Sequence, residues 1–308
     1  MRIVSLLPSA TEIVYALGLE PVAVSHECDY PPEAASKPAV DRSRVDPTAG
    51  SAEIDDQVRR AERDHGGVYE IDLDALREAD PDLIVSQGVC DVCAVDSVLV
   101  EEAVAELDLD AEVLTTDPHG LDDVLADVER VGAATGREER AAELVADLRA
   151  RIDAVASAAI GVDDAPRTLV LDWTDPSMVA GHWIPELVSL AGGEYGLADP
   201  GAASRPIEWE AVRGFDPEVL VVAPCGFRLE QTAENLSDLT GRDGWGDLTA
   251  VREGRAFAMD GHHYVNRPGP RLVDALEHLA ALVHPERFDA PPPDVARSLE
   301  SLEPPAEP

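Results

Sequence analysis

The four cysteines of the chain each follow a short apolar run that is typical of a β-strand. Cys28 follows PVAVSHE, Cys90 and Cys93 follow DLIVSQGV, and Cys225 follows EVLVVAP. In doubly wound α/β proteins, ligands bind in the crevice outside the carboxyl ends of the strands. We therefore expect the cysteines at one edge of the fold, where they mark a candidate binding site.

Cysteine and histidine bind zinc and iron, and Cys90-x2-Cys93 has the spacing of one half of a tetrahedral zinc site. Thiolates and imidazoles from the other strand ends could complete such a site. A redox pair and the packing of small buried residues are alternatives for the same cysteines. The candidate metal ligands are Cys28, Cys90, Cys93, Cys225, His26 and His262.

Histidines and aromatic residues repeat the placement of the cysteines. His262 and His263 follow RAFAMDG, and a neutral imidazole at this position could be an axial ligand of cobalt or iron. Trp173 follows TLVLD and offers a flat apolar face to a macrocycle, with core packing as the alternative. His182 and Trp183 are further candidates, although Trp183 could instead pack at the start of a helix.

Arg267, in NRPGPR, could pair with a carboxylate or phosphate of a ligand through its forked guanidinium. The sequence contains no G-x-G-x-x-G, Walker A, G-x-S-x-G or H-E-x-x-H motif, so the common nucleotide-binding and hydrolase chemistries have no basis in it. We therefore interpret the chain as a binding protein and not an enzyme, with a metalloenzyme as the minority alternative.

Strand-like and helix-like patterns alternate along the chain, which indicates an α/β fold of βαβ units with mainly parallel sheets in two similar lobes. A helical pattern of about 20 residues without Gly or Pro would join the lobes, unless it packs on one lobe alone. We expect an N-terminal lobe over 1–120, a helical connector over 121–160 with the interlobe helix at 138–158, a C-terminal lobe over 161–288, and a disordered, acidic and Pro-rich tail over 289–308.

The chain has 62 acidic and 24 basic residues, a formal charge of −38. The acids are spread along the sequence, so we expect a uniformly acidic surface that disfavours nucleic acid and anionic membranes as partners. A salt-loving host is the simplest explanation, since molar salt screens this self-repulsion. No secretory signal and no long apolar run is visible, so the sequence as written predicts a cytoplasmic protein without membrane insertion, and we expect a monomer.

A series of motifs resembles one known family. RIVSLLPSATEIVYALGL, VAVSHECDYPP, LREADPDLIVSQG, LVLDW and NRPGPRLVDALEHLA occur in the order found in class III substrate-binding proteins of ABC importers. The resemblance spans residues 2–288 and is closest to the branch that binds cobalamin and, more distantly, iron-siderophores and haem. It implies two Rossmann-like lobes, one rigid helix between them, and a ligand held in the interlobe cleft. Members of this family are usually extracytoplasmic.

The resemblance also implies a set of ligand contacts. It places a corrinoid-binding loop on the segment HECDY in the first lobe, and contacts of the second lobe on Trp173 and GHHY. Glu27 departs from the family, because cobalamin binders place an aromatic side chain there and an ionised carboxylate near a corrin costs desolvation energy. The ligand-binding residues that we predict are His26, Glu27, Cys28, Tyr30, Gln87, Trp173, His182, Trp183, Gly261, His262, His263, Tyr264 and Arg267.

In the family, an acidic residue on each lobe docks on arginines of a membrane permease, and the matching positions here are Asp74 and Glu210. The leading prediction is a binding protein for cobalamin or a related metal chelate, which it delivers to an ABC importer. The alternative is an intracellular zinc or iron–sulfur metalloprotein that uses the four cysteines and the cleft histidines.

Overall fold

The computed structural model describes residues 1–89, 97–159 and 165–302, so the candidate metal ligands Cys90 and Cys93 lie outside the described residues. The chain divides into two compact units, each with a sheet and a core. Unit 1 comprises Met1–Thr48, Asp56–Pro118 and Asp122–Leu148, and unit 2 comprises Ala49–Asp55, His119–Leu121 and Arg149–Pro308.

Unit 1 contains a four-stranded sheet in the order β2-β1-β5-β6, and every neighbouring pair in it is parallel. The strands are β1 (Ile3–Ser5), β2 (Ala23–Val24), β5 (Leu83–Gln87) and β6 (Glu112–Thr116). Both β1 and β5 are buried along their whole length, as expected for strands that are covered on both faces. The prediction of a parallel sheet is confirmed for this unit.

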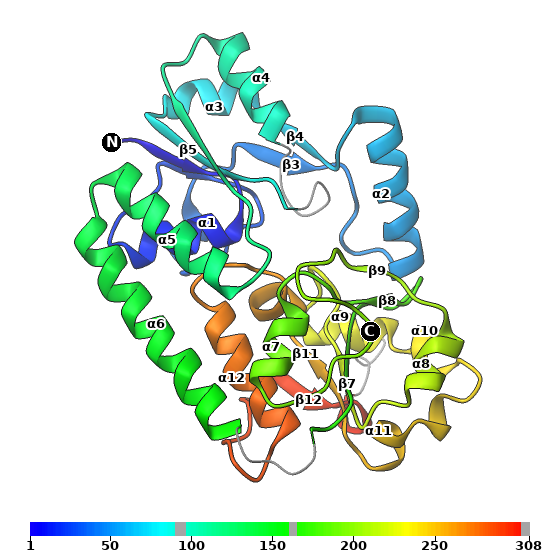
Figure 1. Cartoon of the computed structure of the whole chain (residues 1–308). Helices are drawn as coiled ribbons and strands as arrows, with labels where there is room; N and C mark the ends of the chain where they lie inside the picture. The colour runs from blue at the N-terminus through cyan, green and yellow to red at the C-terminus, as the bar shows by residue number, and fades with distance from the viewer. Residues whose placement is uncertain (90–96, 160–164, 303–308) are drawn as a thin grey trace. The chain divides into compact units, whose positions relative to one another are not determined.

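Helices cover both faces of the unit 1 sheet. In Figure 1, α3 (Leu73–Ala79) and α4 (Ser97–Leu107) lie above the sheet, and α1 (Pro8–Ala16) and α5 (Leu121–Thr135) lie below it. Val4 and Ile84 of the sheet share one apolar cluster with Val100 of α4. The unit also contains the short helix η1 (Ala34–Ser36) and a separate antiparallel pair, β3 (Asp41–Ser43) with β4 (Tyr69–Ile71).

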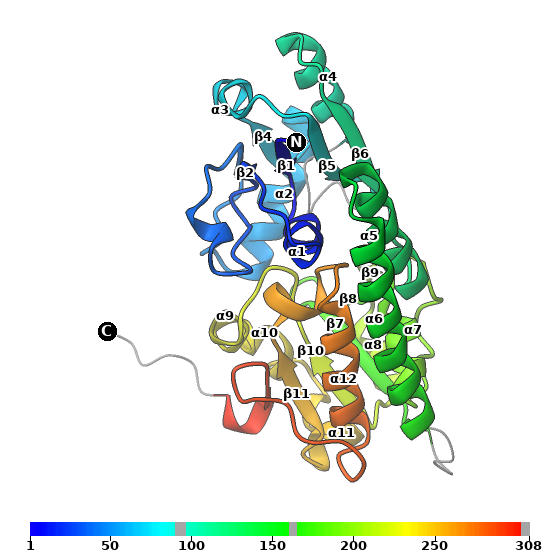
Figure 2. The ribbon, with the colours of Figure 1, turned by 90° about the vertical axis from the view of Figure 1, so that its left-hand side faces the viewer.

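Two helices run from one unit into the other. α2 (Ser51–His65) starts in unit 2, where the N–H of Ser51 donates to Asn235 Oδ1 at 2.9 Å, and ends in unit 1. α6 (Glu138–Ala159) has 22 residues, hence a length of about 33 Å. Its second half belongs to unit 2, where Arg151 forms ion pairs with Glu277 and Asp274 of α12 (Leu272–Val283). Figures 1 and 2 both show this part of α6 alongside α12.

The sheet of unit 2 has six strands in the order β12-β11-β10-β7-β8-β9. The central strands β7 (Thr168–Trp173), β10 (Val219–Val222) and β11 (Ala256–Met259) are parallel, as predicted. The outer strands β8 (Met178–Val179), β9 (Arg205–Pro206) and β12 (Ala296–Ser298) are antiparallel to their neighbours. The parallel centre brings the carboxyl ends of three strands to one edge.

Side chains on alternate positions of the central strands pack against different helices. Leu169, Leu171, Leu220 and Val222 face the layer of α8, α9, α10 and α11, with which they form one apolar cluster. The other face is covered by α7 and α12, which contact each other. The helices are α7 (Ile184–Leu190), α8 (Trp209–Phe215), α9 (Leu229–Asn235), α10 (Ser237–Thr240) and α11 (Thr249–Arg252), with the short turns η2 (Trp245–Asp247), η3 (Gly261–Val265) and η4 (Leu299–Ser301).

The prediction of a disordered tail over residues 289–308 is wrong for the part that the structure describes, which extends to residue 302. β12 pairs with β11, and Leu299 and Leu302 are buried in the core of unit 2. A three-residue strand is too short to show a periodic pattern, and it forms because β11 offers an open edge to pair with. In the described residues, no helix combines the length and the apolar character needed to cross a membrane.

Candidate ligand-binding site

In unit 1, the loop after β2 is held by one buried carboxylate. Asp41 Oδ1 accepts hydrogen bonds from the backbone N–H of His26 at 2.8 Å and from the hydroxyl of Ser25 at 3.0 Å. The Nδ1 of His26 lies 2.6 Å from the same oxygen, and Nε2 lies 3.3 Å from Oε1 of Glu27. Asp41 therefore fixes the position of His26, although nothing in the sequence around it distinguishes it from the other acids.

His26 is held as a cation between two carboxylates. Burial lowers the pKa of His26, but hydrogen bonds with Asp41 and Glu27, together with their charges, outweigh burial and raise the pKa from 6.5 to about 9. A doubly protonated imidazole has no lone pair to donate to a metal ion. At neutral pH the surroundings of His26 therefore favour an ion pair over the metal-ligand role considered from the sequence.

Cys28 lies in the small apolar cluster of Val24 and Ala34 and is 3% exposed. Thr11 donates a hydrogen bond to its sulfur at 3.0 Å. This environment matches the packing alternative for Cys28, since buried thiols behave as small apolar groups.

The other candidates of unit 1 differ in accessibility. Gln87, at the end of β5, is 6% exposed. Tyr30 is 42% exposed, and the side chain of Glu27 is 35% exposed. Tyr30 and Glu27 are therefore both accessible to a ligand.

In unit 2, the ends of β7 and β10 bring two aromatic rings together. The rings of Trp173 and Phe227 lie 5.0 Å apart at 53°, and the indole N–H of Trp173 donates to the carbonyl of Asp175 at 3.1 Å. The carbonyl of Phe227 accepts the N–H groups of Gly261 and His262 from the loop after β11. All three strand ends are thus joined into one edge, as the α/β pattern predicted.

The loop after β11 contains a histidine that a carboxylate orients. Asp260 Oδ1 accepts the backbone N–H of His263 at 2.7 Å, and Asp260 Oδ2 lies 2.8 Å from Nδ1 of the same residue. The ring of His262 packs edge-on against that of His263, with centroids 4.7 Å apart. Arg267 donates to Nε2 of His262 at 2.8 Å and is only 4% exposed. Arg267 therefore positions His262. The sequence predicted a guanidinium that is accessible to a carboxylate of the ligand, and the buried guanidinium of Arg267 differs from that prediction.

Gly261 has a structural reason to be glycine. A Cβ at this position would lie 2.1 Å from the carbonyl oxygen of Pro224 and 2.8 Å from that of Ala223. Such contacts are far closer than a side chain allows, so the histidine loop can approach the end of β10 only without a Cβ.

Trp183 and Tyr264 also pack within unit 2. Trp183 is 6% exposed and donates its indole N–H to the carbonyl of Val265 at 2.8 Å, which matches the packing alternative. The ring of Tyr264 lies 5.4 Å from that of His278, and the guanidinium carbon of Arg271 lies 5.4 Å from the Tyr264 centroid. These contacts hold the part of the loop that follows His263.

Asp172, at the end of β7, is a site residue that sequence reasoning missed. Burial raises the pKa of Asp172 to about 6, and a hydrogen bond from Ser204 to Oδ2 opposes this change. Its carbonyl accepts the N–H of Cys225 at 3.0 Å. Asp172 directly precedes Trp173, so the position of the carboxylate could have been inferred from the same strand-end rule.

The described residues give no support to a metal site built on cysteine. Cys28 belongs to unit 1 and Cys225 to unit 2, and neither is in a disulfide within the described part of the chain. Among the residues that the structure describes, no group of three potential metal ligands includes a cysteine.

The two expected docking acids are exposed and occupy equivalent positions. Asp74 lies in the first turn of α3 with its side chain 94% exposed, and Arg77 donates to it at 2.6 Å. Glu210 lies in the first turn of α8 with its side chain 81% exposed, and Arg213 lies 3.3 Å from it.

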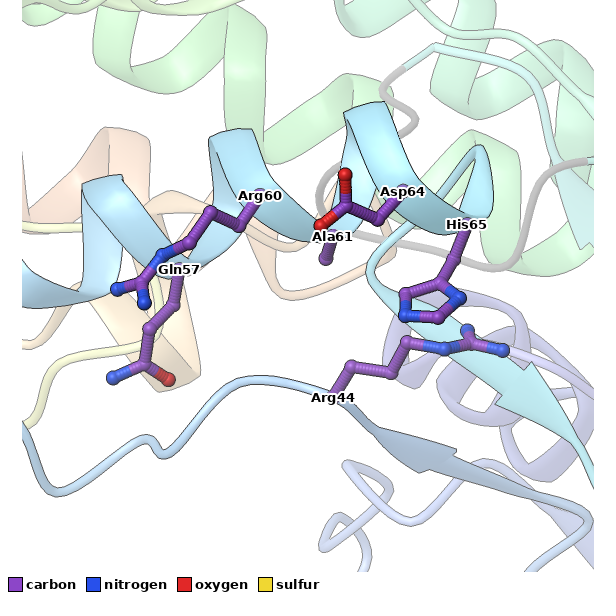
Figure 3. A pocket seen from close by; sticks show the side chains of 6 residues that line it. All are labelled: Arg44, Gln57, Arg60, Ala61, Asp64 and His65. Atoms are coloured by element: carbon purple, nitrogen blue, oxygen red, sulfur yellow. The ribbon is translucent and has the colours of Figure 1, made fainter.

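Two small hollows lie within single units. One, of about 190 Å³, lies between α2 and the end of β3, where Figure 3 shows the ring of His65 beside the guanidinium of Arg44. The other, of about 220 Å³, lies in unit 2 beside Trp245 and Leu299. Both are smaller than the roughly 300–1,000 Å³ of typical small-molecule sites. Neither contains the strand-end residues.

Two α/β units with histidines and aromatic side chains at their strand ends define a binding protein of the two-lobed type. A family model described as periplasmic binding protein matches residues 3–262, and the chain belongs to this family. The prediction from the motif series is confirmed.

Curated relatives cover most of the chain. An uncharacterized ABC transporter substrate-binding lipoprotein, YvrC of Bacillus subtilis, is 25% identical over 93% of this chain and 81% of its own length. A vitamin B12-binding protein of Vibrio cholerae is 24% identical over 90% of this chain and 87% of its own length. A cobalamin-binding protein of Halobacterium salinarum is 29% identical over 53% of this chain and 44% of its own length. These relatives are substrate-binding proteins, so the prediction of a binding protein rather than an enzyme is confirmed.

Solved structures share the fold. The apo form of the periplasmic heme-binding protein RhuT from Roseiflexus sp. RS-1 superposes with a TM-score of 0.69 at 24% identity, covering 92% of this chain and 98% of its own. The periplasmic vitamin B12-binding protein BtuF of Vibrio cholerae superposes with a TM-score of 0.65 at 22% identity, covering 92% and 96%. The α/β class of two-lobed binding proteins is therefore confirmed.

Proposed function

We propose that the protein binds a corrinoid such as cobalamin and delivers it to the permease of an ABC importer. The names of the relatives from Vibrio cholerae and Halobacterium salinarum support this ligand class. The heme-binding neighbours share only the fold, so haem and ferric chelates are the competing ligands to be tested.

The pair of Asp260 and His263 is the observation that carries the proposal. When the Nδ1–H of a histidine donates to a carboxylate, the lone pair of the ring is on Nε2, and Nε2 is the atom that binds a metal. The carboxylate also increases the basicity of Nε2. Asp260 lies 2.8 Å from Nδ1 of His263 and accepts its backbone N–H as well. His263 is therefore the residue that would hold the cobalt of a corrinoid, through Nε2.

Trp173 supplies a partly exposed apolar ring at the same edge, and the buried ring of Phe227 supports it from behind. Trp173 and Phe227 meet at 5.0 Å, and the Phe227 carbonyl holds the histidine loop against them. A flat macrocycle gains from contact with such rings through area burial and stacking. We assign stacking to Trp173 and metal coordination to His263.

The test is titration of the purified protein with hydroxocobalamin in high salt. We expect a shift of the cobalamin absorption bands and co-elution on gel filtration. His263→Ala should abolish the shift and Trp173→Ala should weaken binding at least about tenfold, which is 1.4 kcal/mol. His65→Ala, at the end of α2, is the matched control and should bind as the wild type does. Binding of haemin or a ferric siderophore without any corrinoid binding would contradict the proposal.

We also propose Asp74 and Glu210 as the permease-docking acids. Both are in the first turn of a seven-residue helix and are among the exposed side chains of their units. Charge reversal (Asp74→Arg or Glu210→Arg) should reduce corrinoid uptake into vesicles that contain the cognate permease, while corrinoid binding in solution stays unchanged. Glu78→Arg, on the same helix as Asp74, is the control. Uptake that is equally insensitive to all three changes would exclude these docking positions.

A further inference from the structure

Two histidines of unit 2 that are distant in sequence meet outside the loops described above. The ring centroids of His119 and His182 lie 6.3 Å apart, and the planes differ by 33°. The centroid of an imidazole lies about 3.2 Å from a metal ion that its nitrogen binds at 2.0–2.1 Å, so two rings that share an ion are at most about 6.4 Å apart. That limit applies to two rings on opposite sides of the ion. At a tetrahedral ion the centroids would lie about 5.2 Å apart, so binding would bring the rings about 1 Å closer than they are here.

His182 is held in place by its backbone and lacks a partner for one ring nitrogen. Its φ of +52° is in the left-handed region, which is uncommon for residues other than glycine. Its N–H donates to the carbonyl of Ala202, and its carbonyl accepts the N–H of Gly201. Among the described residues, the buried Nδ1 has no hydrogen-bond partner. A buried polar atom without a partner is unfavourable, and a bound ion would satisfy it.

The surroundings of His182 disfavour its protonated form. Burial lowers the pKa of His182, and the nearby imidazole of His119 lowers it further. A metal ion binds the neutral form of imidazole, which is the form that these surroundings favour. The described residues bring no third His, Cys or carboxylate ligand to the pair, so water would complete the coordination.

We propose that His119 and His182 form a two-imidazole binding site for a divalent transition-metal ion of borderline softness, for which Zn²⁺ serves as the probe. Imidazole is a donor that suits Zn²⁺, Ni²⁺ and Cu²⁺, and it does not suit Ca²⁺ or Mg²⁺. This site uses neither Trp173 nor His263, to which stacking and metal coordination are assigned above, and it uses no cysteine; it gives His182, a predicted ligand contact, a different role.

The ion would add a connection between two segments of unit 2 that are distant in the sequence. The segment His119–Leu121 belongs to unit 2, although in the sequence it lies between two segments of unit 1. Its described attachments include the bond from the N–H of Leu121 to Glu186 Oε2, at 2.8 Å. A metal bridge would connect His119 to His182, and binding to the folded state alone raises stability with ion concentration.

The test uses the full chain, stripped of metal with a chelator and kept in high salt. The sequence has only eight histidines, so the ring ¹⁵N resonances can be followed individually while Zn²⁺ is added. We expect the resonances of His119 and His182 to move together at one equivalent, and the melting temperature to rise. His119→Ala and His182→Asn should each remove the response; Asn is chosen because it tolerates the left-handed backbone.

His65→Ala is the control and should respond to Zn²⁺ as the wild type does. Resonances of His119 and His182 that stay in place while Zn²⁺ is added, or that move independently, would overturn the proposal, as would a Zn²⁺ response retained in both variants. Since the probe is Zn²⁺ alone, this result is independent of whether hydroxocobalamin binds.

Discussion

Each unit uses a carboxylate to fix one histidine in the same way. Asp41 and Asp260 both accept a backbone N–H and lie within hydrogen-bond distance of Nδ1 of the same histidine, His26 in unit 1 and His263 in unit 2. This double contact determines the orientation of the ring. Glu27 adds a second negative charge beside His26, which makes that histidine a cation, and the ring of His262 packs against His263. The same local geometry thus serves an ion pair in one unit and a candidate metal ligand in the other.

Replacing Asp41 by Asn should lower the pKa of His26 from about 9 towards 6.5 or below, because burial is then opposed by Glu27 alone. Ring resonances followed by NMR over pH 5 to 10 measure this directly. Glu27→Gln is the comparison and should lower the pKa less, since its carboxylate is farther away and 35% exposed. An unchanged pKa in Asp41→Asn would show that Asp41 does not hold the charge.

The same ion pair makes a pH-dependent contribution to folding. Because folding raises the pKa of His26, the pair stabilises the fold fully below the unfolded pKa of 6.5, and this stabilisation is lost as the pH rises through about 9. The destabilisation by Asp41→Asn should therefore be larger at pH 6 than at pH 10, by about 2 kcal/mol. Urea unfolding at the two pH values gives the difference, and an equal loss at both would contradict the assignment.

At the scale of elements, one helix–strand connection occurs twice. The segments DLDALREADPDLIV, from Asp72, and EWEAVRGFDPEVLV, from Glu208, align without a gap and form α3–β5 and α8–β10. Each helix ends at an aspartate with positive φ. An arginine directly before the neighbouring strand of the sheet, β1 or β7, donates to the carbonyl of that aspartate and to the one before it. These arginines are Arg2 and Arg167. The two units therefore form the same helix–strand turn with the same residue types, an aspartate and an arginine.

The two aspartates of this turn should respond differently to replacement by glycine. Both have positive φ, 43° at Asp80 and 47° at Asp216, where glycine is the preferred residue. Asp216 also accepts the N–H and the hydroxyl of Thr249, both at 2.8 Å. We expect Asp80→Gly to change the free energy of unfolding by less than about 1 kcal/mol, and Asp216→Gly to lower it by about 1–2 kcal/mol. Denaturant unfolding measures both, and a larger loss for Asp80→Gly would contradict this account.

The sequence predicted the strands that are apolar runs and missed three short strands for a physical reason. Strands buried on both faces are continuous apolar runs, so β1, β5, β7 and β10 could be predicted directly. β3, β9 and β12 have two or three residues each and no periodic pattern, and they form because a neighbouring strand offers an edge. In the site, the strand-end rule located Trp173 and His263. It could not predict that Arg267 is buried behind His262, because this contact depends on the path of the loop.

For the whole molecule, charge is the dominant feature. With 62 acids and 24 basic residues, most of the acids cannot form ion pairs. The ion pairs that do form are mainly exposed, such as Arg42 with Glu70 and Arg77 with Asp74, and pairs of this kind contribute little. Repulsion among the remaining acids destabilises the compact state at low salt. We propose on this basis that the protein works in a salt-rich environment.

We therefore expect the melting temperature to rise as KCl increases from about 0.1 to 1 M, because the Debye length falls from about 10 to 3 Å over this range. Screening is nearly complete at that point, so the rise should level off above it. Calorimetry over a KCl series measures the effect, and K₂SO₄ at the same ionic strength is the control. If exclusion of salt from the surface were the cause, sulfate would stabilise far more than chloride and without levelling off. A melting temperature that does not change over the KCl series would refute charge repulsion as the factor that limits stability.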